Sequence, residues 1–366
     1  MPGDVFIWFG CLTLVCLSAL LIILLGAFAK GIKNLDSKID PDQISILIPF
    51  RNEPDLLSQM SFLKRQTSET GIGVFWIDDF SDNITDEVLA AFEKEHTFNL
   101  FRRTKGKPGK KEAISFGIKK LNTEWVWLMD ADSRPDLMFF AKGGFRIKKS
   151  WRMILFPLVP MRVKGFTRKL FDLEFLVLQL VTHASAILGR PLLANGASLL
   201  VNRKDYIESL AHRADFNIPS GDDVFALFAF QDKYGRSSIG SGAKFLSPMK
   251  VGFPNNFIGL WKQRVRWVSK TPAVPDIWYL FVSALVFISN TSFAVLLAYS
   301  FTQGANTLIS WSIGAYFAVA FLFISRSIVF GKRKDLVLYI VPAILAYPFY
   351  LSALLFASLV SKPKWK

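Results

Sequence analysis

The amino-acid sequence predicts an α/β domain joined to transmembrane helices, with one helix before the domain and about three after it. The chain of 366 residues is 51 % hydrophobic, with a mean hydropathy of +0.32, yet 20 % of its residues are charged. This mean hydropathy is high for a soluble enzyme, while the fraction of charged residues excludes a protein that lies entirely within the membrane. Uncharged segments lie near both ends of the chain, and apolar β-branched runs alternate with helical patterns between them.

The first predicted element is a transmembrane helix within residues 1–30. Residues 5–29 carry no charge, and a helix of this length spans a bilayer core of about 30 Å. A cleaved signal peptide is the alternative, but the start of the chain carries Asp4 and no Lys or Arg. The positive-inside rule places the N-terminus outside and the next segment in the cytoplasm. The basic residues after the run are Lys30, Lys33 and Lys38.

The α/β domain is expected at residues 40–245, where strands and helices alternate. The predicted strands are 44–50, one within 69–81, and 125–129, and the predicted helices are 55–63, 85–92 and 110–121. Asp82 or Asn83 could cap the second helix. This βαβ series predicts parallel strands whose carboxyl ends form a ligand crevice. The polar residues at these ends are Arg51, Asn52, Glu53, Asp78, Asp79, Asp130 and Asp132.

The remainder of the chain is expected to form an interfacial helix segment at 246–272 and transmembrane helices at 273–366. The stretch 277–325 is uncharged and long enough for two helices joined at a polar hinge, 303–307. The last span, 336–361, is interrupted by two prolines. Counting spans places the basic tail outside, against the positive-inside rule, so either the last span does not fully cross or earlier charges overrule the tail. The tail lysines are Lys362, Lys364 and Lys366.

Charge and composition exclude several other classes. The net charge of +15 suits anionic lipid headgroups or phosphates, and no nucleic-acid motif accompanies it, so no nucleic-acid partner is expected. Cys11 and Cys16 lie inside the first span, and the three histidines fit no zinc pattern. Transport would require charged groups within the spans. The spans contain only small polar groups, such as Asn290, Thr291 and Ser310, which suit helix packing.

Six motifs occur in order between residues 44 and 267: ILIPFRNE, WIDDFSD, GKPGKKEAISFGI, MDADSRPD, PSGDDVFAL and QRVRW. Together they resemble the membrane-embedded family 2 glycosyltransferases, a branch that includes cellulose, chitin and hyaluronan synthases and ceramide glucosyltransferase. The resemblance implies the GT-A fold, a Rossmann-like nucleotide-diphospho-sugar transferase domain. It also implies transfer of a sugar from a UDP-sugar with inversion.

Asp130 and Asp132 are the candidate metal ligands. The residue between them alternates away in an extended segment, so both carboxylates can face one side. Mg²⁺ or Mn²⁺ binds a few carboxylates together with phosphate oxygens, and such a cation would neutralise a departing diphosphate. The resemblance makes Asp132 the principal ligand. An Asp-rich turn after a strand is the alternative.

The resemblance also implies a donor pocket. Asp79 would contact the uracil ring, and the pocket would be bordered by Pro49, Arg51 and Glu53. The usual Tyr-Asn-Glu of the family reads Phe50, Arg51, Asn52, Glu53 in this chain, with an extra basic residue.

The loop 105–111, KGKPGKK, is basic, contains glycine and opens a predicted helix. Its lysines and free backbone N–H groups could therefore face phosphate. Lys110 aligns with the lysine of the family, and Asp130 joins it as a substrate-binding residue. A solvated run of charges is the alternative.

The catalytic candidates are Asp223, Asp222, Gln263, Arg266 and Trp267. An inverting transfer needs a base for the acceptor hydroxyl. The SGDD segment stands where the family has Thr-Glu-Asp, which makes Asp223 the implied base and Asp222 the replacement for the glutamate. Adjacent acids can raise one another's pKa. Capping of a helix by Ser220 or Asp222 is an alternative that is compatible with this role.

In the QxxRW motif, Gln263, Arg266 and Trp267 share one helix face. A guanidinium could reach the diphosphate, and an indole offers a flat surface to a sugar or lipid. An interfacial anchor is the alternative. Residues 195–203 resemble the segment that shapes the acceptor pocket.

These features predict an inverting membrane glycosyltransferase that moves a sugar from a UDP-sugar to a lipid or lipid-linked glycan. A lipid acceptor is favoured because the polymer synthases of the family use more helices than the four counted here. A processive polysaccharide synthase, acting with a partner or as an oligomer, is the alternative. A non-catalytic nucleotide-sugar-binding scaffold is more remote, since Asp132, Asp223 and Arg266 are all present. The expected location is the inner (plasma) membrane, multi-pass, with a cytoplasmic catalytic domain.

Overall fold

A seven-stranded sheet forms the centre of the α/β domain in the computed structural model, which describes residues 2–82, 84–94, 98–141, 143–213, 221–244, 246–304 and 306–360. The strand order is β10-β7-β9-β5-β2-β3-β4. The bounds are β2 (Ile44–Phe50), β3 (Gly73–Asp78), β4 (Phe98–Arg102), β5 (Trp125–Met129), β7 (Met153–Leu155), β9 (Ser198–Asn202) and β10 (Ile239–Ser241). Two short pairs lie beside the sheet: β1 (Ser37–Ile39) with β6 (Phe145–Ile147), and β8 (Leu158–Pro160) with β11 (Met249–Val251).

The predicted strands are parallel as expected, but the sheet also contains an antiparallel strand that was not predicted. β2, β3, β4 and β5 are parallel, but β9 runs antiparallel to both β5 and β7. Met129, the last residue of β5, pairs with Ser198, the first residue of β9. The chain therefore enters β9 at the sheet edge where β5 ends, which brings 195–197 to the same edge as Asp130 and Asp132.

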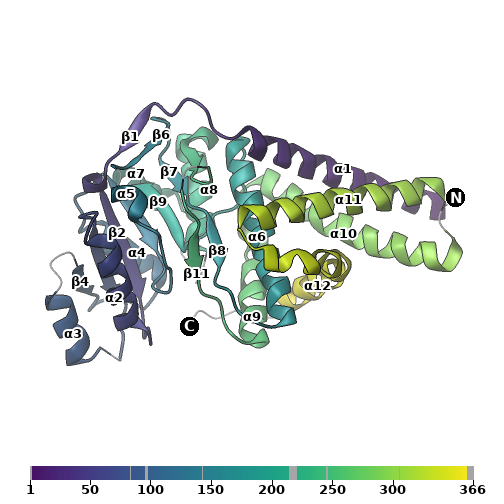
Figure 1. Ribbon diagram of the computed structural model, residues 1–366. Helices are drawn as coiled ribbons and strands as arrows, with labels where there is room; N and C mark the ends of the chain where they lie inside the picture. The colour runs from purple at the N-terminus through teal and green to yellow at the C-terminus, as the bar shows by residue number, and fades with distance from the viewer. Residues whose placement is uncertain are drawn as a thin grey trace.

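Helices cover both faces of the sheet (Figure 1). Those of the domain are α2 (Leu56–Thr67), α3 (Asp86–Glu93), α4 (Lys110–Ile118), α5 (Met138–Ala141), α7 (Arg203–Ser209) and α8 (Asp222–Tyr234). Thr85, not Asp82, caps α3, because its hydroxyl accepts a hydrogen bond from the Val88 N–H at 3.4 Å; Asn83 lies outside the described residues. Short 3-10 turns lie at Pro41–Gln43, Leu210–His212, Arg236–Ser238, Thr271–Ala273 and Lys334–Tyr339.

The central strands are buried on both faces, as their largely apolar sequences require. All five residues of β5 are buried, as are six of the seven residues of β2. Gly117 of α4 allows that helix to approach the sheet closely, because a Cβ there would lie 2.7 Å from a methyl carbon of Leu47. This packing fixes α4, and with it Lys110 at its first turn, against β2.

Three long helices, α1 (Pro2–Lys30), α10 (Ile277–Gln303) and α11 (Thr307–Phe330), extend away from the sheet as a bundle (Figure 1). They lie where the sequence predicts spans, with the break between α10 and α11 at the expected hinge. Their polar groups join helices: the Tyr316 hydroxyl donates to the Asn290 side-chain oxygen at 3.1 Å, and the Ser289 hydroxyl donates to the Thr13 carbonyl at 2.9 Å. These contacts confirm Asn290 as a packing residue.

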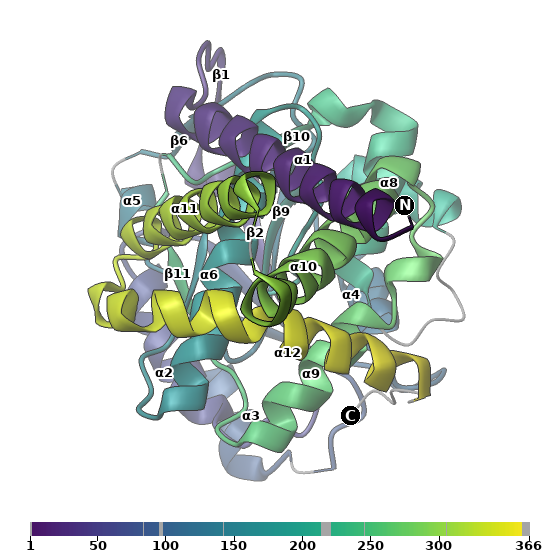
Figure 2. The same cartoon turned by 90° about the vertical axis from the view of Figure 1, so that its right-hand side faces the viewer.

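Two further helices, α6 (Phe166–Ile187) and α12 (Ile340–Val360), also have the length and composition of a span, which makes five among the described residues. α12 does not follow the bundle but lies across its base (Figures 1 and 2). α6 was not predicted as a helix. It stands between the sheet and the bundle, and 67 % of its apolar window is buried inside the protein. We interpret α6 as a platform on which the bundle and the domain meet.

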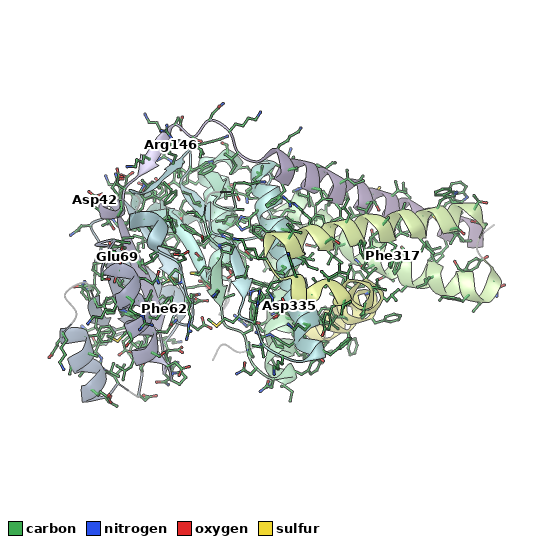
Figure 3. All side chains as sticks on the ribbon, viewed as in Figure 1. Asp42, Phe62, Glu69, Arg146, Phe317 and Asp335 are labelled. Atoms are coloured by element: carbon green, nitrogen blue, oxygen red, sulfur yellow. The ribbon has the colours of Figure 1, made fainter. Side chains whose placement is uncertain are left out.

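Buried charges join this platform to its neighbours. Asp172 of α6 accepts from Arg168 at 2.9 Å and from Arg333, which precedes α12, at 2.9 Å. Arg333 also donates to the Pro160 carbonyl at 3.1 Å and to Asp335 at 2.8 Å. Figure 3 shows Asp335 at this junction, whereas Phe317 lies out in the bundle. The bundle is thus connected to strand β8 of the domain.

Candidate active site

The loops after β2 and β3 are joined at the carboxyl edge of the sheet. The Asp79 N–H donates to the Phe50 carbonyl at 2.9 Å. The Asn52 N–H donates to the Ser81 hydroxyl at 2.9 Å, and the Asn52 side-chain oxygen accepts from the Asp82 N–H at 2.8 Å. Asn52 has φ of 51°, a left-handed conformation that Asn tolerates better than most residues. These bonds hold Arg51 and the neighbouring Glu53 at the carboxyl edge of the sheet, where the sequence predicts the pocket for the sugar donor.

Asp79 is buried, and both of its carboxylate oxygens have partners. One oxygen pairs with the Arg103 guanidinium, and the other accepts from the Gly109 N–H at 2.6 Å. Burial raises the pKa of Asp79, against the lowering effect of the Gly109 N–H and of Arg103. In this arrangement the carboxylate fixes the 103–109 loop in front of α4. Contact between Asp79 and a nucleotide base stays a prediction.

Lys110 joins two of the predicted acidic segments. Its Nζ lies 2.5 Å from Oδ1 of Asp130 and 3.6 Å from Oδ2 of Asp222. Burial favours the neutral amine, but the charges of Asp130 and Asp222 outweigh it and raise the pKa of Lys110. The lysine is therefore charged, and it brings the segment after β5 to within a few ångströms of the start of α8. The solvated charge run, weighed as an alternative, does not describe Lys110.

Asp132 lies at the open side of this cluster. Burial of its carboxyl group, together with the negative charges of Asp130 and Glu53, raises its pKa to about 7 although part of the side chain faces solvent. Gly252, just after β11, faces this carboxylate: a Cβ there would lie 3.0 Å from Oδ2 of Asp132. The site has a surplus of negative charge beside Asp132.

This donor set fits a hard divalent cation. Across the described residues no group of three or more His, Cys, Asp and Glu could hold a metal by itself. Mg²⁺ and Mn²⁺ sites that handle phosphates commonly take one or two carboxylates and complete the shell with phosphate oxygens and water. Asp132, with its raised pKa, and Asp130 offer such a partial shell, and the cation would remove the repulsion between them.

Asp223 is oriented by backbone N–H groups at the start of α8. Its Oδ2 accepts from the Gly196 N–H at 2.9 Å, and its Oδ1 accepts from the Val224 N–H at 2.8 Å. Gly196 allows this approach, since a Cβ there would lie 3.2 Å from Oδ2 of Asp222. The segment 195–203, expected near the acceptor, therefore contacts the predicted base directly.

The expectation that Asp222 and Asp223 raise one another's pKa is wrong for Asp222. Burial acts in that direction, but the positive charges of Lys110, Arg213 and Lys270 outweigh it and lower the pKa of Asp222. Asp222 also does not cap the helix: Gly221 holds the cap position, and Ser220 lies outside the described residues.

The QxxRW motif lies on α9 (Phe257–Val268), which ends beside this cluster. Arg266 is half-buried, and both its charge and that of Asp223 act on Lys270. Gln263 and Trp267 instead contact Arg264, a residue that sequence reasoning did not select. Gln263 accepts from the Arg264 guanidinium at 2.6 Å, and the same guanidinium lies 4.4 Å from the centre of the Trp267 ring.

Arg264 is 1 % exposed and pairs with Glu174 of α6 at 2.9 Å. Glu174 also accepts from the Tyr350 hydroxyl of α12 at 3.1 Å. Arg264 therefore ties the motif helix to both α6 and α12. The only feature of the sequence that could have drawn attention to Arg264 was its position inside the QxxRW motif.

Lys270 and Gly252 were also missed by sequence reasoning, whereas Gly196 lies in the segment 195–203 that it selected. Lys270 packs over Gly221, where a Cβ would lie 3.0 Å from its side-chain Cδ. Burial lowers the pKa of Lys270, as does Arg266, while Asp223 raises it. The available signal for Lys270 was its position three residues after the tryptophan of the motif. Gly252 left no signal that spacing could reveal.

Residues 45–156 match the model of the family described as glycosyl transferase family 2. No curated protein sequence matches the chain. Among solved structures, the mannosyltransferase PcManGT from Pyrobaculum calidifontis, in complex with GDP-Man and Mn²⁺, is 14 % identical with a TM-score of 0.54, and the match covers 94 % of this chain and 99 % of that one.

Two other solved structures are similar at lower TM-scores. S. aureus TarS 1-349 is 10 % identical with a TM-score of 0.39, covering 84 % of this chain and 91 % of that one. Glucosyl-3-phosphoglycerate synthase from Mycobacterium tuberculosis is 15 % identical with a TM-score of 0.39, covering 64 % and 81 %. The likeness to PcManGT confirms the predicted fold. Residues 45–156 are therefore similar to glycosyl transferase family 2, the chain has the GT-A fold, and the protein is a glycosyltransferase.

Proposed function

We propose that this protein transfers a sugar, with inversion, from a UDP-sugar to a lipid or lipid-linked glycan at the cytoplasmic face of the inner membrane. The observation that carries the proposal is the position of Lys110 between Asp130 and Asp222. This contact gathers the predicted donor and acceptor segments into one cluster at the carboxyl edge of the sheet, where α/β folds bind ligands.

In the proposed reaction, Asp223 is the general base. Its carboxylate takes the proton of the acceptor hydroxyl while that oxygen forms a bond to the anomeric carbon of the sugar. The bond between the anomeric carbon and the diphosphate oxygen breaks on the opposite face, and its electron pair leaves with the nucleoside diphosphate. The Gly196 N–H, 2.9 Å from Oδ2 of Asp223, orients the carboxylate for this step.

The departing diphosphate carries negative charge that the site must balance. Lys110 and Arg266 supply charged donors from α4 and α9, and Lys270 adds a third positive charge near Asp223. Asp132 and Asp130 would hold a Mg²⁺ or Mn²⁺ ion, whose chemistry is to stabilise the diphosphate as a leaving group. Pro49, Arg51, Glu53 and Asp79 are the proposed border of the nucleotide pocket.

The membrane setting favours a lipid acceptor. α9, which carries the motif, contacts α6 and α12 through Arg264, Glu174 and Tyr350, so the site adjoins helices with the composition of membrane segments. A single transfer requires only a lateral opening toward the bilayer. A processive synthase would need a pore that a partner or further copies of the chain provide.

The test is transfer by the purified full-length protein, in detergent with native lipid extract and Mg²⁺ or Mn²⁺. UDP-glucose, UDP-galactose, UDP-N-acetylglucosamine and GDP-mannose would be compared, the last because PcManGT was solved with GDP-Man. We expect label from a UDP-sugar in a discrete organic-soluble product, abolished by EDTA. Label from GDP-mannose alone would overturn the proposal that the donor carries uracil. Label in high-mass polymer would overturn the proposed lipid acceptor.

Substitutions assign the residues. Asp223→Asn should lower the transfer rate by about 10²- to 10⁴-fold, the usual contribution of a general base. Asp132→Ala should remove the response to added metal. Asp42→Asn is the matched control, because Asp42 lies on the outer surface of the domain, away from the cluster (Figure 3). Unchanged transfer in Asp223→Asn would show that another group is the base.

A further inference from the structure

Three basic side chains lie where α1 and α11 reach the α/β domain. None of them belongs to the candidate active site. They are Lys244, in the loop between β10 and β11, Arg326 of α11, and Lys332 just after α11. Nζ of Lys244 lies 4.6 Å from the centre of the Phe28 ring, and the Arg326 guanidinium lies 5.4 Å from the same ring. We call these three residues the junction cluster.

The positive charges of this cluster are not balanced locally. The stem of Lys244 lies along Gly31, where a Cβ would be 3.4 Å from its Cε. Burial lowers the pKa of Lys244, and the charge of Arg326 lowers it further. Within the parts of the chain that the structure describes, neither Lys244 nor Arg326 forms a salt bridge with an acid. The group that faces both positive charges is the Phe28 ring.

A groove of about 310 Å³ opens beside the cluster. Lys244 and Lys332 supply its charge, and its apolar walls come from Leu246, Pro248 and Phe330. Phe330 packs edge-on against Phe28, with ring centres 5.5 Å apart. The groove therefore offers two amines beside an apolar surface, which is the combination that a phosphate attached to an acyl-bearing glycerol requires.

The groove also lies beside the domain-side ends of two helices that could cross a membrane, which is where a lipid headgroup would be. α1 ends at Lys30 and α11 ends at Phe330, so the domain-side ends of two long, mostly apolar helices border the groove. Their exposed apolar side chains, such as Val329 at 62 %, continue the apolar surface away from the domain. Clusters of basic residues next to the ends of membrane helices attract anionic lipids.

We propose that this groove binds the phosphate headgroup of an anionic membrane lipid, in the leaflet that faces the α/β domain. Lys244 and Lys332 contact the phosphate from two sides, and Arg326 adds a third charge across Phe28. The acyl chains lie along the apolar surface of α11. This site is separate from sugar transfer, and its occupation does not depend on the identity of the donor or acceptor.

The test is lipid binding by the full-length protein, purified in a nonionic detergent and followed by native mass spectrometry. Phosphatidylglycerol and phosphatidylcholine with the same acyl chains would be titrated separately, with inorganic phosphate as a third arm. We expect one phosphatidylglycerol to bind in preference to phosphatidylcholine, and phosphate alone to compete weakly. Equal binding of the two lipids would overturn the proposal, and so would saturation by inorganic phosphate without lipid.

A triple variant, Lys244→Gln, Arg326→Gln, Lys332→Gln, should weaken phosphatidylglycerol binding by roughly 100-fold, since each basic residue near an anionic surface adds a similar increment of affinity. The matched control removes the same charges from the exposed far side of the domain, at Arg65, Lys94 and Lys119. Equal losses in the two triple variants would overturn the proposal.

A charge-retaining variant separates loss of the site from loss of the fold. Lys244→Arg with Lys332→Arg should keep preferential binding of phosphatidylglycerol, because the guanidinium also binds phosphate. If this variant binds no better than the glutamine variant although it is folded, the charges are not the cause of lipid binding.

Discussion

Arg264 should control the rate of transfer although it stands at an unassigned position of the motif. The informative change is Arg264→Met, which keeps the length and apolar stem of the side chain and removes the guanidinium. It breaks the pair with Glu174, the bond to Gln263 and the contact with the Trp267 ring. Lys262→Met is the matched control, because Lys262 is exposed on the same helix.

The expected loss of stability follows from the groups that Arg264→Met leaves without a partner. Removing one partner of a buried ion pair costs about 3 to 5 kcal/mol. Glu174 is 13 % exposed and keeps the Tyr350 hydroxyl, so we expect the lower end of that range, about 3 kcal/mol. Gln263 and Trp267 lose the group that orients them, and a misplacement of about 1 Å at a reacting centre can cost roughly 10²-fold in rate.

Two measurements distinguish positioning from simple destabilisation: initial rates of transfer at saturating donor, and thermal unfolding in the same detergent. The double variant Arg264→Met, Glu174→Gln leaves no unpaired charge, so it should recover much of the stability but not the rate. Arg264→Lys keeps the charge, but one ammonium cannot reproduce the planar fork that bonds Glu174 and Gln263 together, so it too should stay slow.

The reasoning would be refuted by a folded Arg264→Met protein whose rate stays within a factor of about two of the parent. It would also be refuted if the double variant recovered rate and stability in parallel, since the rate loss would then be a consequence of instability alone.

Three further predictions concern the surroundings of the site. Gly252→Ala should raise the Mn²⁺ concentration needed for transfer by roughly 10-fold, because the added methyl group meets Asp132 at 3.0 Å; an unchanged metal titration would contradict this. Asp172→Asn should lower stability by about 3 kcal/mol, because Arg168 loses its charged partner while Arg333 keeps Asp335; an unchanged unfolding midpoint in detergent would show that the network contributes little. A C-terminal tag should be protected from protease in right-side-out vesicles, because α12 lies across the bundle and is expected not to cross the membrane; cleavage from outside would mean that it does.

The strands were predictable because local sequence determines them. β2 and β5 have the predicted bounds, since each is a largely apolar run that stops at a charged residue: Arg51 after β2 and Asp130 after β5. The reversal of β9 was not predictable from the alternation of strands and helices, because it depends on where the long α6 returns the chain. The same reversal places Gly196 against Asp223.

The candidate site was predictable as a set of segments but not as a set of contacts. Asp130, Asp222 and Lys110 were each selected from separate motifs, and the ion pairs that join them could not be read from spacing. The pKa of Asp222 shows the limit of local reasoning. Its neighbour in the sequence predicts a raised pKa, but cations from three other segments lower it.

The acids of α6 join this helix to the domain junction, although its length and composition would also suit a membrane span. An isolated charge in a bilayer is costly, so a spanning helix avoids Asp and Glu or pairs them within the bundle. Asp172 pairs with Arg168 and with Arg333, which follows the domain-side end of α11, and Glu174 pairs with Arg264 of the motif helix. Each acid therefore fixes a different membrane-side element to the same platform. A change in the position of α11 or α12 would therefore act on the motif helix through α6. The charges of this apolar helix are thus a condition for holding the motif helix in place beside the site.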